Sequence, residues 1–204
     1  MSNLSADSVK KGQIITFGEY PQSDITGKVK EPLEWRVLDV KDGKALIITV
    51  KGIENIMYHE SNMAITWETC GLRNWLHEVF LKENFTEEEQ ARAVMTHNVN
   101  KDSLVHGAVG GNDTDDLIFC LSIDEANEIF DSDDERTAPA TPYAVNKGAF
   151  IHESNGNCWW WLRSPGYYTS DAAGINYYGY VHVSGDNVSS PSDALRPCMW
   201  ISLD

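Results

Sequence analysis

The chain begins with a pattern typical of β-strands, in which apolar and β-branched residues gather in short runs between turn residues. Residues 14–17 predict a short strand that ends at Gly18. Residues 34–40 and 44–50 form two longer runs, and Lys41-Asp42-Gly43 between them is a strong hairpin signal. We therefore expect an N-terminal β-hairpin.

A helical spacing replaces this pattern after Thr69. Apolar residues then recur at positions that share one helix face, namely Leu72, Trp75, Leu76, Val79 and Phe80. Capping signals predict three more helices: Thr86 with Glu89 before residues 87–95, Ser122 with Glu125 before residues 123–130, and Thr141 before Pro142.

Two regions are expected to carry little regular structure. The first ten residues are polar and should be loose, and residues 96–116 are polar with three glycines, so they predict a long surface loop or a mobile arm. This segment should be the least ordered part of the interior of the chain. Residues 117–121 that follow are apolar and predict a buried strand.

The last fifth of the chain has two apolar runs, residues 158–166 and 194–201, which predict paired scaffold strands. Between them we expect a small meander with turns at residues 176–179 and 184–187. Its strands would be residues 173–175, 180–183 and 188–190. The residues that should point inward are Ala173, Ile175, Val181, Val183 and Val188.

The composition between the two runs indicates a contact surface. Five of the eight tyrosines lie there, among serine, glycine and asparagine. Tyrosine offers a large contact area at low rotamer cost, and the small polar residues offer adaptable hydrogen bonds, as in antibody paratopes. The candidate ligand-binding residues are Tyr167, Tyr168, Ser170, Asn176, Tyr177, Tyr178, Tyr180, His182, Asp186 and Asn187.

Size and charge narrow the classes of partner. A chain of 204 residues fits one domain with a substantial core. The net charge of -15 disfavours nucleic acid, because phosphate binding depends on Lys and Arg. No window reaches the roughly 20 apolar residues of a membrane span, and the polar start lacks a signal-peptide core, so we expect a soluble protein without membrane insertion. The oligomeric state stays open.

Other residues have a functional and a structural interpretation. Trp159, Trp160 and Trp161 could stack on a ligand, but strand alternation favours core packing for at least one. Arg163 and Arg196 could hold an anion, but their apolar surroundings favour bonds to backbone carbonyls or a buried carboxylate. The acidic runs at residues 113–116 and 131–135 are most simply interpreted as solvent-exposed charges. The first run does not match an EF-hand calcium loop, because the glycine and the distal glutamate of that motif are absent at the required positions. We therefore expect no metal and no cofactor.

The cysteines favour buried free thiols. Cys70, Cys120, Cys158 and Cys198 are widely spaced, which fits neither a zinc motif nor a dense disulfide framework. The six histidines are scattered, and no motif ties one of them to a nucleophile. We therefore expect a protein without a catalytic site.

Several segments resemble, in the same order, a family of bacterial and phage proteins described as a domain of unknown function. These segments are residues 17–22, the Glu34-Trp35 hairpin, residues 67–69 and 72–76, residues 85–89, residues 158–166, Ala172-Ala173, residues 195–197 and Trp200-Ile201. The resemblance implies a C-type-lectin-like fold in the C-terminal half. Some members are similar to the variable proteins of diversity-generating retroelements, in which the varied side chains form the ligand-binding face.

Together these features predict an α+β protein of one domain. Residues 1–12 would be flexible, residues 13–157 would form a hairpin with two to four short helices, and residues 158–204 would form the strand-rich binding half with small antiparallel sheets. The expected partner is a protein or cell-surface ligand, and the compartment would be the cytoplasm or a phage particle. Because the formylglycine-generating enzymes share a lectin-like fold, the alternative is an enzyme with a cysteine or metal centre. Calcium-dependent sugar binding is not expected, because the Glu-Pro-Asn and Gln-Pro-Asp triplets are absent.

Overall fold

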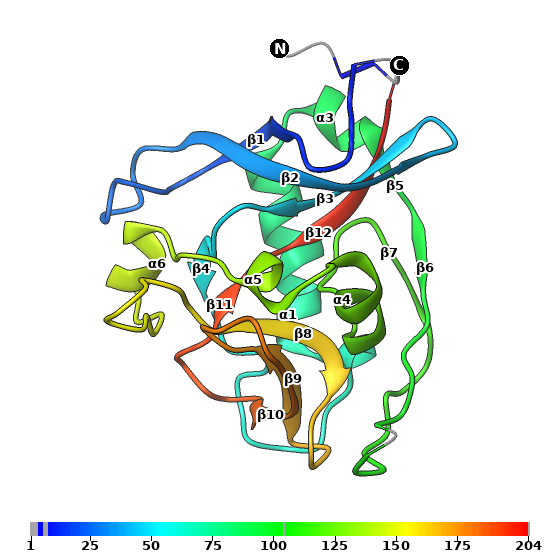
Figure 1. Cartoon of the computed structure of the whole chain (residues 1–204), viewed down its shortest axis with the longest axis vertical. Coiled ribbons are helices and arrows are strands. Elements are labelled where there is room, and N and C mark those ends of the chain that lie inside the picture. Colours follow the sequence, from blue (N-terminus) through cyan, green and yellow to red (C-terminus); the bar gives the residue numbers. More distant parts are fainter. Residues whose placement is uncertain (1–3, 6–7, 104, 204) are drawn as a thin grey trace.

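Three β-sheets and several short helices build an α+β structure, in which one sheet curls into a half-barrel (Figure 1). The computed structural model describes residues 4–5, 8–103 and 105–203. Its strands are β1 (Ile14–Tyr20), β2 (Glu31–Lys41), β3 (Lys44–Thr49), β4 (Glu54–Asn55), β5 (Ala93–Val94), β6 (Thr96–Asn98), β7 (Thr114–Asp116), β8 (Trp160–Pro165), β9 (Asp171–Ile175), β10 (Val181–Asn187), β11 (Ala194–Leu195) and β12 (Cys198–Ser202).

The first sheet has the strand order β1-β2-β3-β12-β5. Its centre is the hairpin of β2 and β3, which confirms the expectation from the turn signal. Strand β1 runs past Gly18 instead of ending there, so that prediction is wrong. Gly18 has φ +69°, and the pairing with β2 shifts between Thr16 and Glu19, so the glycine forms a bulge and the strand continues.

The second sheet has the order β10-β9-β8-β11-β4 and is mixed, because β11 runs parallel to β8. The expected pairing of the two apolar runs is confirmed only where Ala194 faces Trp160. Beyond Pro197 the chain enters the first sheet, where β12 pairs with β3 and β5. One apolar run therefore serves both sheets, as the red strand in Figure 1 shows.

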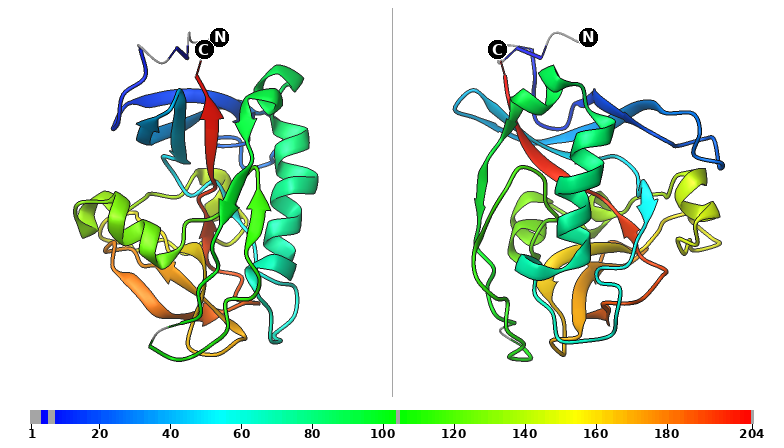
Figure 2. Two further views of the ribbon diagram at one scale, coloured as in Figure 1. Left: turned by 90° about the vertical axis from the view of Figure 1, so that its right-hand side faces the viewer. Right: turned by 180° about the vertical axis from the view of Figure 1, so that it is seen from behind.

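Residues 96–116, which were expected to be a long loop or a mobile arm, contain a third, two-stranded sheet. Strands β6 and β7 pair antiparallel, from Thr96 with Asp116 to Asn98 with Thr114. The segment is thus a ribbon at its base, and its far part lies beside the second sheet (Figure 2). Leu104, within the segment expected to be least ordered, lies outside the described residues.

The apolar residues 117–121 are not a regular strand. Phe119 makes one isolated bridge, in which it exchanges both backbone hydrogen bonds with Cys198. Ile118, Phe119 and Cys120 are nevertheless buried, so the expectation of burial is right and that of a strand is wrong.

A continuous helical rod crosses the rear of the molecule and faces the viewer in the right-hand view of Figure 2. It consists of α1 (Gly71–Trp75), a π-helical stretch η2 (Leu76–Phe80) and α2 (Leu81–Asn84), and it follows a short 3₁₀ turn, η1 (Trp67–Thr69). The rod buries Leu72, Leu76 and Phe80, as the predicted spacing requires.

The capping signals are confirmed for the remaining predicted helices. The capping boxes of Thr86 and Ser122 are both present, and Thr141 accepts a bond from the backbone N–H of Ala144. The first of these helices ends at Arg92, earlier than expected, because the chain joins the first sheet there. The helices are α3 (Glu87–Arg92), α4 (Ile123–Ile129) and α6 (Pro142–Asn146), and the sequence did not predict α5 (Asp133–Arg136).

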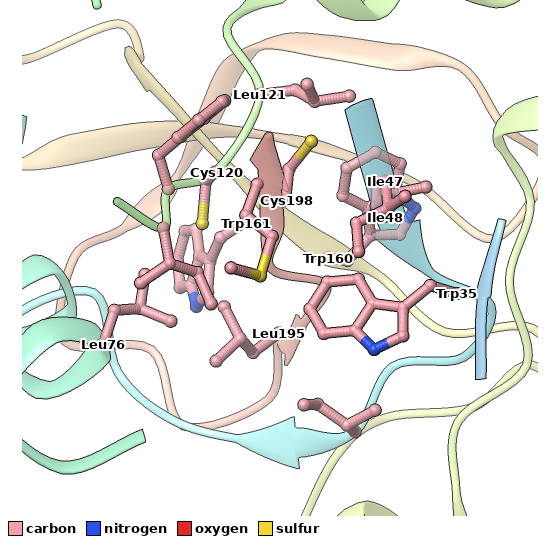
Figure 3. Packing of buried hydrophobic residues seen from close by; sticks show 14 of the residues in the cluster. Trp35, Ile47, Ile48, Leu76, Cys120, Leu121, Trp160, Trp161, Leu195 and Cys198 are labelled. Atoms are coloured by element: carbon pink, nitrogen blue, oxygen red, sulfur yellow. The ribbon is translucent and has the colours of Figure 1, made fainter. Parts of the chain in front are cut away.

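The core fills the space between the two larger sheets and the helical rod (Figure 3). Trp35, Trp160 and Trp161 have no exposed surface. Leu4 and Val9 are also buried, so the expectation of a loose N-terminus is wrong for them, while residues 1–3 and 6–7 lie outside the described residues. Within the described part of the chain, no helix has the length and apolar character to cross a membrane.

Candidate binding site

The candidate binding face is built on the hairpin of β9 and β10, at the edge of the second sheet (Figure 1). The predicted meander is partly wrong. The turn expected at residues 184–187 lies within β10, and the strand expected at residues 188–190 is a turn. The other expected turn, at residues 176–179, is present.

Gly185 is the physical reason for the difference. Its φ is +70°, and the pairing with β9 shifts between His182 and Asp186, so the residue forms a bulge inside a continuing strand. A Cβ atom on Gly185 would lie 2.2 Å from the carbonyl oxygen of Ala172. Turn-like residues therefore bend the strand and bring it close to its neighbour.

The inward side of the hairpin is largely as expected. Ala173, Ile175 and Val188 are buried, whereas Val181 and Val183 are only half-buried. The expected inward direction is thus confirmed for the first three residues and is incomplete for the two valines of β10.

The outward side carries the tyrosines. Tyr167, Tyr168, Tyr178 and Tyr180 are 46%, 64%, 48% and 56% exposed. Such values mean that these rings stand on the surface, at the turns that precede β9 and β10. Of the other candidate residues, Asp186 is exposed, and Ser170, Asn176, Tyr177, His182 and Asn187 are half-buried.

Tyr177 is the centre of one aromatic group, which we call the Tyr177 cluster. Its ring stacks on His152 at 4.1 Å between centroids and meets Tyr178 edge-on at 4.4 Å. Trp159 contacts Tyr177 at 6.0 Å and His182 at 5.1 Å. The cluster joins the hairpin to a preceding loop and comprises Phe150, His152, Trp159, Tyr177, Tyr178 and His182.

Tyr167 and Tyr168 form a second group with the ribbon segment. The His106 ring lies 4.3 Å from the ring of Tyr167, which contacts Tyr168 at 4.5 Å. His106 Nε2 also lies 3.4 Å from the hydroxyl of Ser184. Residues 96–116 therefore contribute to the face, which the sequence did not indicate because nothing along the chain links the two segments.

Asn176 and Asn187 have local structural roles. The Asn176 side-chain oxygen accepts bonds from the backbone N–H groups of Tyr178 and Tyr180, at 2.9 and 3.1 Å. The Asn187 side-chain oxygen accepts bonds from the N–H and the hydroxyl of Ser189. Asn176 holds the turn that presents Tyr178 and Tyr180, Asn187 holds the turn after β10, and a ligand contact by either remains a prediction.

An open cavity of about 420 Å³ lies beside the Tyr177 cluster. Aromatic rings and two carboxylates line it, and the residues are Phe150, Trp159, Tyr177, His182, Gly185, Asp186, Ser192 and Asp193. Sequence reasoning missed Phe150 and Asp193 as site residues. In the sequence, Asp193 merely ends the tyrosine-rich segment, and no local pattern indicates that its side chain is buried.

Arg163 and Arg196 are structural, in agreement with the favoured interpretation. Arg163 pairs with Glu125 and donates to the carbonyl of Cys120 at 2.9 Å. Arg196 donates twice to the carbonyl of Thr49, and its guanidinium lies 4.7 Å from the ring centroid of Trp160. Neither guanidinium is available to an anionic ligand.

The acidic run at residues 113–116 is not wholly solvated, so that expectation is wrong for Asp116. Its carboxylate has no exposed surface and accepts bonds from Trp67 Nε1 at 3.0 Å, Arg73 Nε at 2.6 Å, Asn98 Nδ2 at 2.9 Å and the Thr114 hydroxyl at 2.7 Å. Burial would raise the pKa of Asp116, but hydrogen bonds from His77, Trp67, Thr114 and Asn98 hold it well below its usual value. Asp116 fastens the ribbon to the helical rod.

The cysteines are free and buried, as predicted: Cys70, Cys120, Cys158 and Cys198. Burial raises the pKa of each thiol, to about 12 for Cys70 and Cys158. Because the thiolate is the nucleophile, these environments suit packing rather than reaction. Among the described residues, no group of three histidine, cysteine or acidic side chains could hold a metal ion.

Comparison with known proteins identifies a family. The family model of a domain of unknown function, DUF6273, matches residues 42–203. The match begins in the hairpin turn and spans the helical rod, the ribbon, the second sheet and the strands β3, β5 and β12 of the first sheet. No curated protein and no solved structure matches the chain.

Proposed function

The chain belongs to the DUF6273 family, and from this premise we propose that it is a recognition protein that binds a protein or cell-surface ligand through its tyrosine-rich face. The observation that carries the proposal is the exposure of Tyr167, Tyr168, Tyr178 and Tyr180 above a buried apolar layer. Monomeric proteins rarely expose a contiguous aromatic surface unless a partner covers it.

Rigidity of the backbone supports the same function. The tyrosines stand on turns whose backbone N–H groups donate to the side-chain oxygens of Asn176 and Asp171. Residues held in this way lose little conformational entropy when a ligand binds, so more of the contact energy contributes to affinity. The face therefore combines adaptable chemistry with a fixed shape.

We also propose that the C-terminal half has a C-type-lectin-like fold and that the face varies between relatives, as in the variable proteins of diversity-generating retroelements. The small sheets, the short helices and the position of the tyrosine-rich segment support this idea. The test is genomic. A neighbouring reverse transcriptase with a near-copy of the codons for residues 166–196, differing mainly at adenines, is expected, and its absence would argue against variation.

The direct test of recognition uses a ligand selected from an array of bacterial cell-surface proteins and glycans. Combined replacement of Tyr168, Tyr178 and Tyr180 by Ala should abolish binding. The melting temperature should change little, because exposed substitutions usually cost within about 0.5 kcal/mol each. Titration calorimetry and thermal denaturation of the same samples provide both measurements.

The matched control removes exposed apolar surface elsewhere. Ile25 and Val29 are 50% and 57% exposed in the connection between β1 and β2, and their joint replacement by Ala should leave binding intact. Unfolding of the triple tyrosine variant, or undiminished binding by it, would refute the proposed face.

The enzyme alternative remains a prediction that nothing in the structure favours. A cysteine centre would need an exposed thiol with a lowered pKa, whereas the pKa of each thiol here is raised by burial. A native-state thiol that reacts unusually fast would revive it.

A further inference from the structure

A buried carboxylate with one oxygen that lacks a hydrogen-bond partner lines the cavity beside the Tyr177 cluster. Asp193 immediately precedes β11 and is only 2% exposed, and its Oδ2 atom has no hydrogen-bond partner. A buried carboxylate is normally paired or well hydrogen-bonded, because removing an uncompensated charge from water is costly. The structure thus holds an acceptor that nothing in the described chain satisfies.

The electrostatic surroundings of Asp193 favour a positive ligand. Asp186 lines the same cavity and is exposed, and the described lining contains no Lys or Arg. Burial, and then the charge of Asp186, raises the pKa of Asp193 to about 7, while hydrogen bonds to Ser190 and Ser192 act in the opposite direction. An incoming cation would restore the missing charge pair. His182 Nδ1, also on this cavity, is a second buried atom without a partner.

Aromatic rings form the other part of the lining. Trp159 meets the rings of Tyr177 and His182 edge-on, and Phe150 lies 6.2 Å from Tyr177. The face of an aromatic ring attracts an ammonium or guanidinium group within about 6 Å of its centroid, and tryptophan does so most strongly. Carboxylates beside aromatic faces are the combination that recognises organic cations.

We propose that this cavity binds the cationic side chain of a lysine or arginine presented by a protein ligand. The inference rests on the proposed function, because it specifies the chemistry of the partner at the same face. The long aliphatic part of such a side chain would lie along Phe150 and Trp159, and its charged end would pair with Asp193 and Asp186. The net charge of -15 would draw a basic partner towards the protein.

Other ligand classes fit less well. An anionic group would be repelled by the two carboxylates. A neutral apolar ligand would leave Oδ2 of Asp193 without a hydrogen-bond partner. A metal ion would lack ligands, since no group of three suitable side chains exists among the described residues. The volume of about 420 Å³ lies within the usual range of small-ligand sites and exceeds the need of one side chain.

The experiment uses n-butylammonium and n-propylguanidinium as probes, with n-butanol and butyrate as uncharged and anionic controls of similar length. Titration of the whole chain at about pH 8 is followed by NMR of the tryptophan indoles and by calorimetry. We expect saturable binding of the two cations and no saturable binding of the controls. Asp193→Asn should weaken cation binding by about tenfold or more, because it removes the charge and preserves the shape.

The control variant is Asp42→Asn, at the turn between β2 and β3. It removes one negative charge far from the cavity, at a positive φ that asparagine tolerates, and should bind the cations as the wild type does. Cations that bind no better than n-butanol, or bind Asp193→Asn unchanged, would overturn the inference. If Asp193→Asn does not fold, the exposed residue Asp186 serves instead. Asp186→Asn must then weaken binding by about twofold or more at low salt, and no change would overturn the inference.

The outcomes separate this inference from the proposed function. If the selected partner needs the tyrosines but the cations do not bind, recognition stands and the cation site fails. If the cations bind through Asp193 while the triple tyrosine variant keeps its partner, the cation site stands and the tyrosine face fails.

Discussion

Asp193 is the residue at which burial and charge conflict most clearly. Its pKa is about 7 in the folded protein, against an ordinary value of 3.8. The folded state therefore holds this proton more tightly than the unfolded chain does. The contribution of Asp193 to the free energy of unfolding is therefore fully present below about pH 3.8 and is lost as the pH rises to about 7.

Asp193→Asn should remove this pH dependence. Relative to the wild type, the variant should gain stability between about pH 4 and pH 7, by about 4 kcal/mol at most, because one pKa unit corresponds to about 1.4 kcal/mol. Urea denaturation at several pH values measures the difference. A constant difference between the two proteins across this range would show that Asp193 has an ordinary pKa.

Trp161 and Trp200 differ in environment. Trp161 is fully buried and donates from Nε1 to the carbonyl of Ile56 at 2.9 Å. Trp200 is half-buried, and the Lys41 ammonium lies 5.1 Å from its ring centroid. Trp200 therefore buries less of its side chain than Trp161 does.

Trp161→Ala should cost roughly 3–5 kcal/mol of unfolding free energy, as large core truncations do. Trp200→Ala should cost distinctly less, because water and Lys41 already cover part of the ring. Chemical denaturation of the two variants side by side tests the order. Equal losses of unfolding free energy would show that the partial exposure of Trp200 does not reduce its contribution to stability.

Among the elements, the β6–β7 ribbon is attached to the helical rod through a buried carboxylate. Asp116 at the end of β7 accepts bonds from Trp67 and Arg73, which precede and begin the helical rod. Because the pKa of Asp116 is lowered in the folded state, its stabilising effect is present above the ordinary value of 3.8 and is lost as the pH falls below it.

Asp116→Asn should lower stability at neutral pH by roughly 3–5 kcal/mol, since it leaves the buried side of Arg73 without its charge partner. The loss relative to the wild type should shrink below about pH 4, because the carboxylate of the unfolded wild type takes up a proton there while that of the folded protein does not. Denaturation at neutral and acid pH measures both values. Asp115→Asn, on a largely exposed side chain of the same strand, is the control and should change little at either pH.

Elements with local signals could be predicted from the sequence. The β2–β3 hairpin follows from its turn residues, and the helix starts follow from Thr86, Ser122 and Thr141, because each signal acts within a few residues. The tyrosine-rich segment was recognisable as surface for the same reason, since its composition is local.

The remaining features depend on contacts between distant parts of the chain. Ser184 to Asn187 have the composition of a turn, yet pairing with β9 draws them into a strand that bends at Gly185. The burial of Asp193 and the approach of His106 to Tyr167 likewise arise from neighbours far away in the sequence. Periodicity and turn chemistry contain no information about such neighbours.

On the scale of the whole molecule, one core is shared by both large sheets and the helical rod. All four cysteines belong to it, from Cys70 before the rod to Cys198 in β12, and Figure 3 shows Cys120 and Cys198. A thiol reagent can reach them only when this core opens.

We expect all four thiols to remain unreacted with Ellman's reagent in native buffer and to become reactive together across the urea transition. The matching midpoint from tryptophan fluorescence is the control. One thiol that reacts in native buffer would point to a local opening and would favour the enzyme alternative.

Strand β12 also has a consequence for the order of folding. It lies between β3 and β5, although the ribbon and most of the second sheet separate it from both strands along the chain, and the helical rod also separates it from β3. A hairpin such as β2–β3 forms within about 1–10 μs, whereas closing a long loop has a larger entropic cost and is slower. The first sheet therefore stays incomplete during folding, with unpaired edges on β3 and β5, until β12 pairs with both strands. During that interval the nascent protein is most exposed to aggregation, and hydrogen-exchange pulses during refolding should protect β2 and β3 before β12.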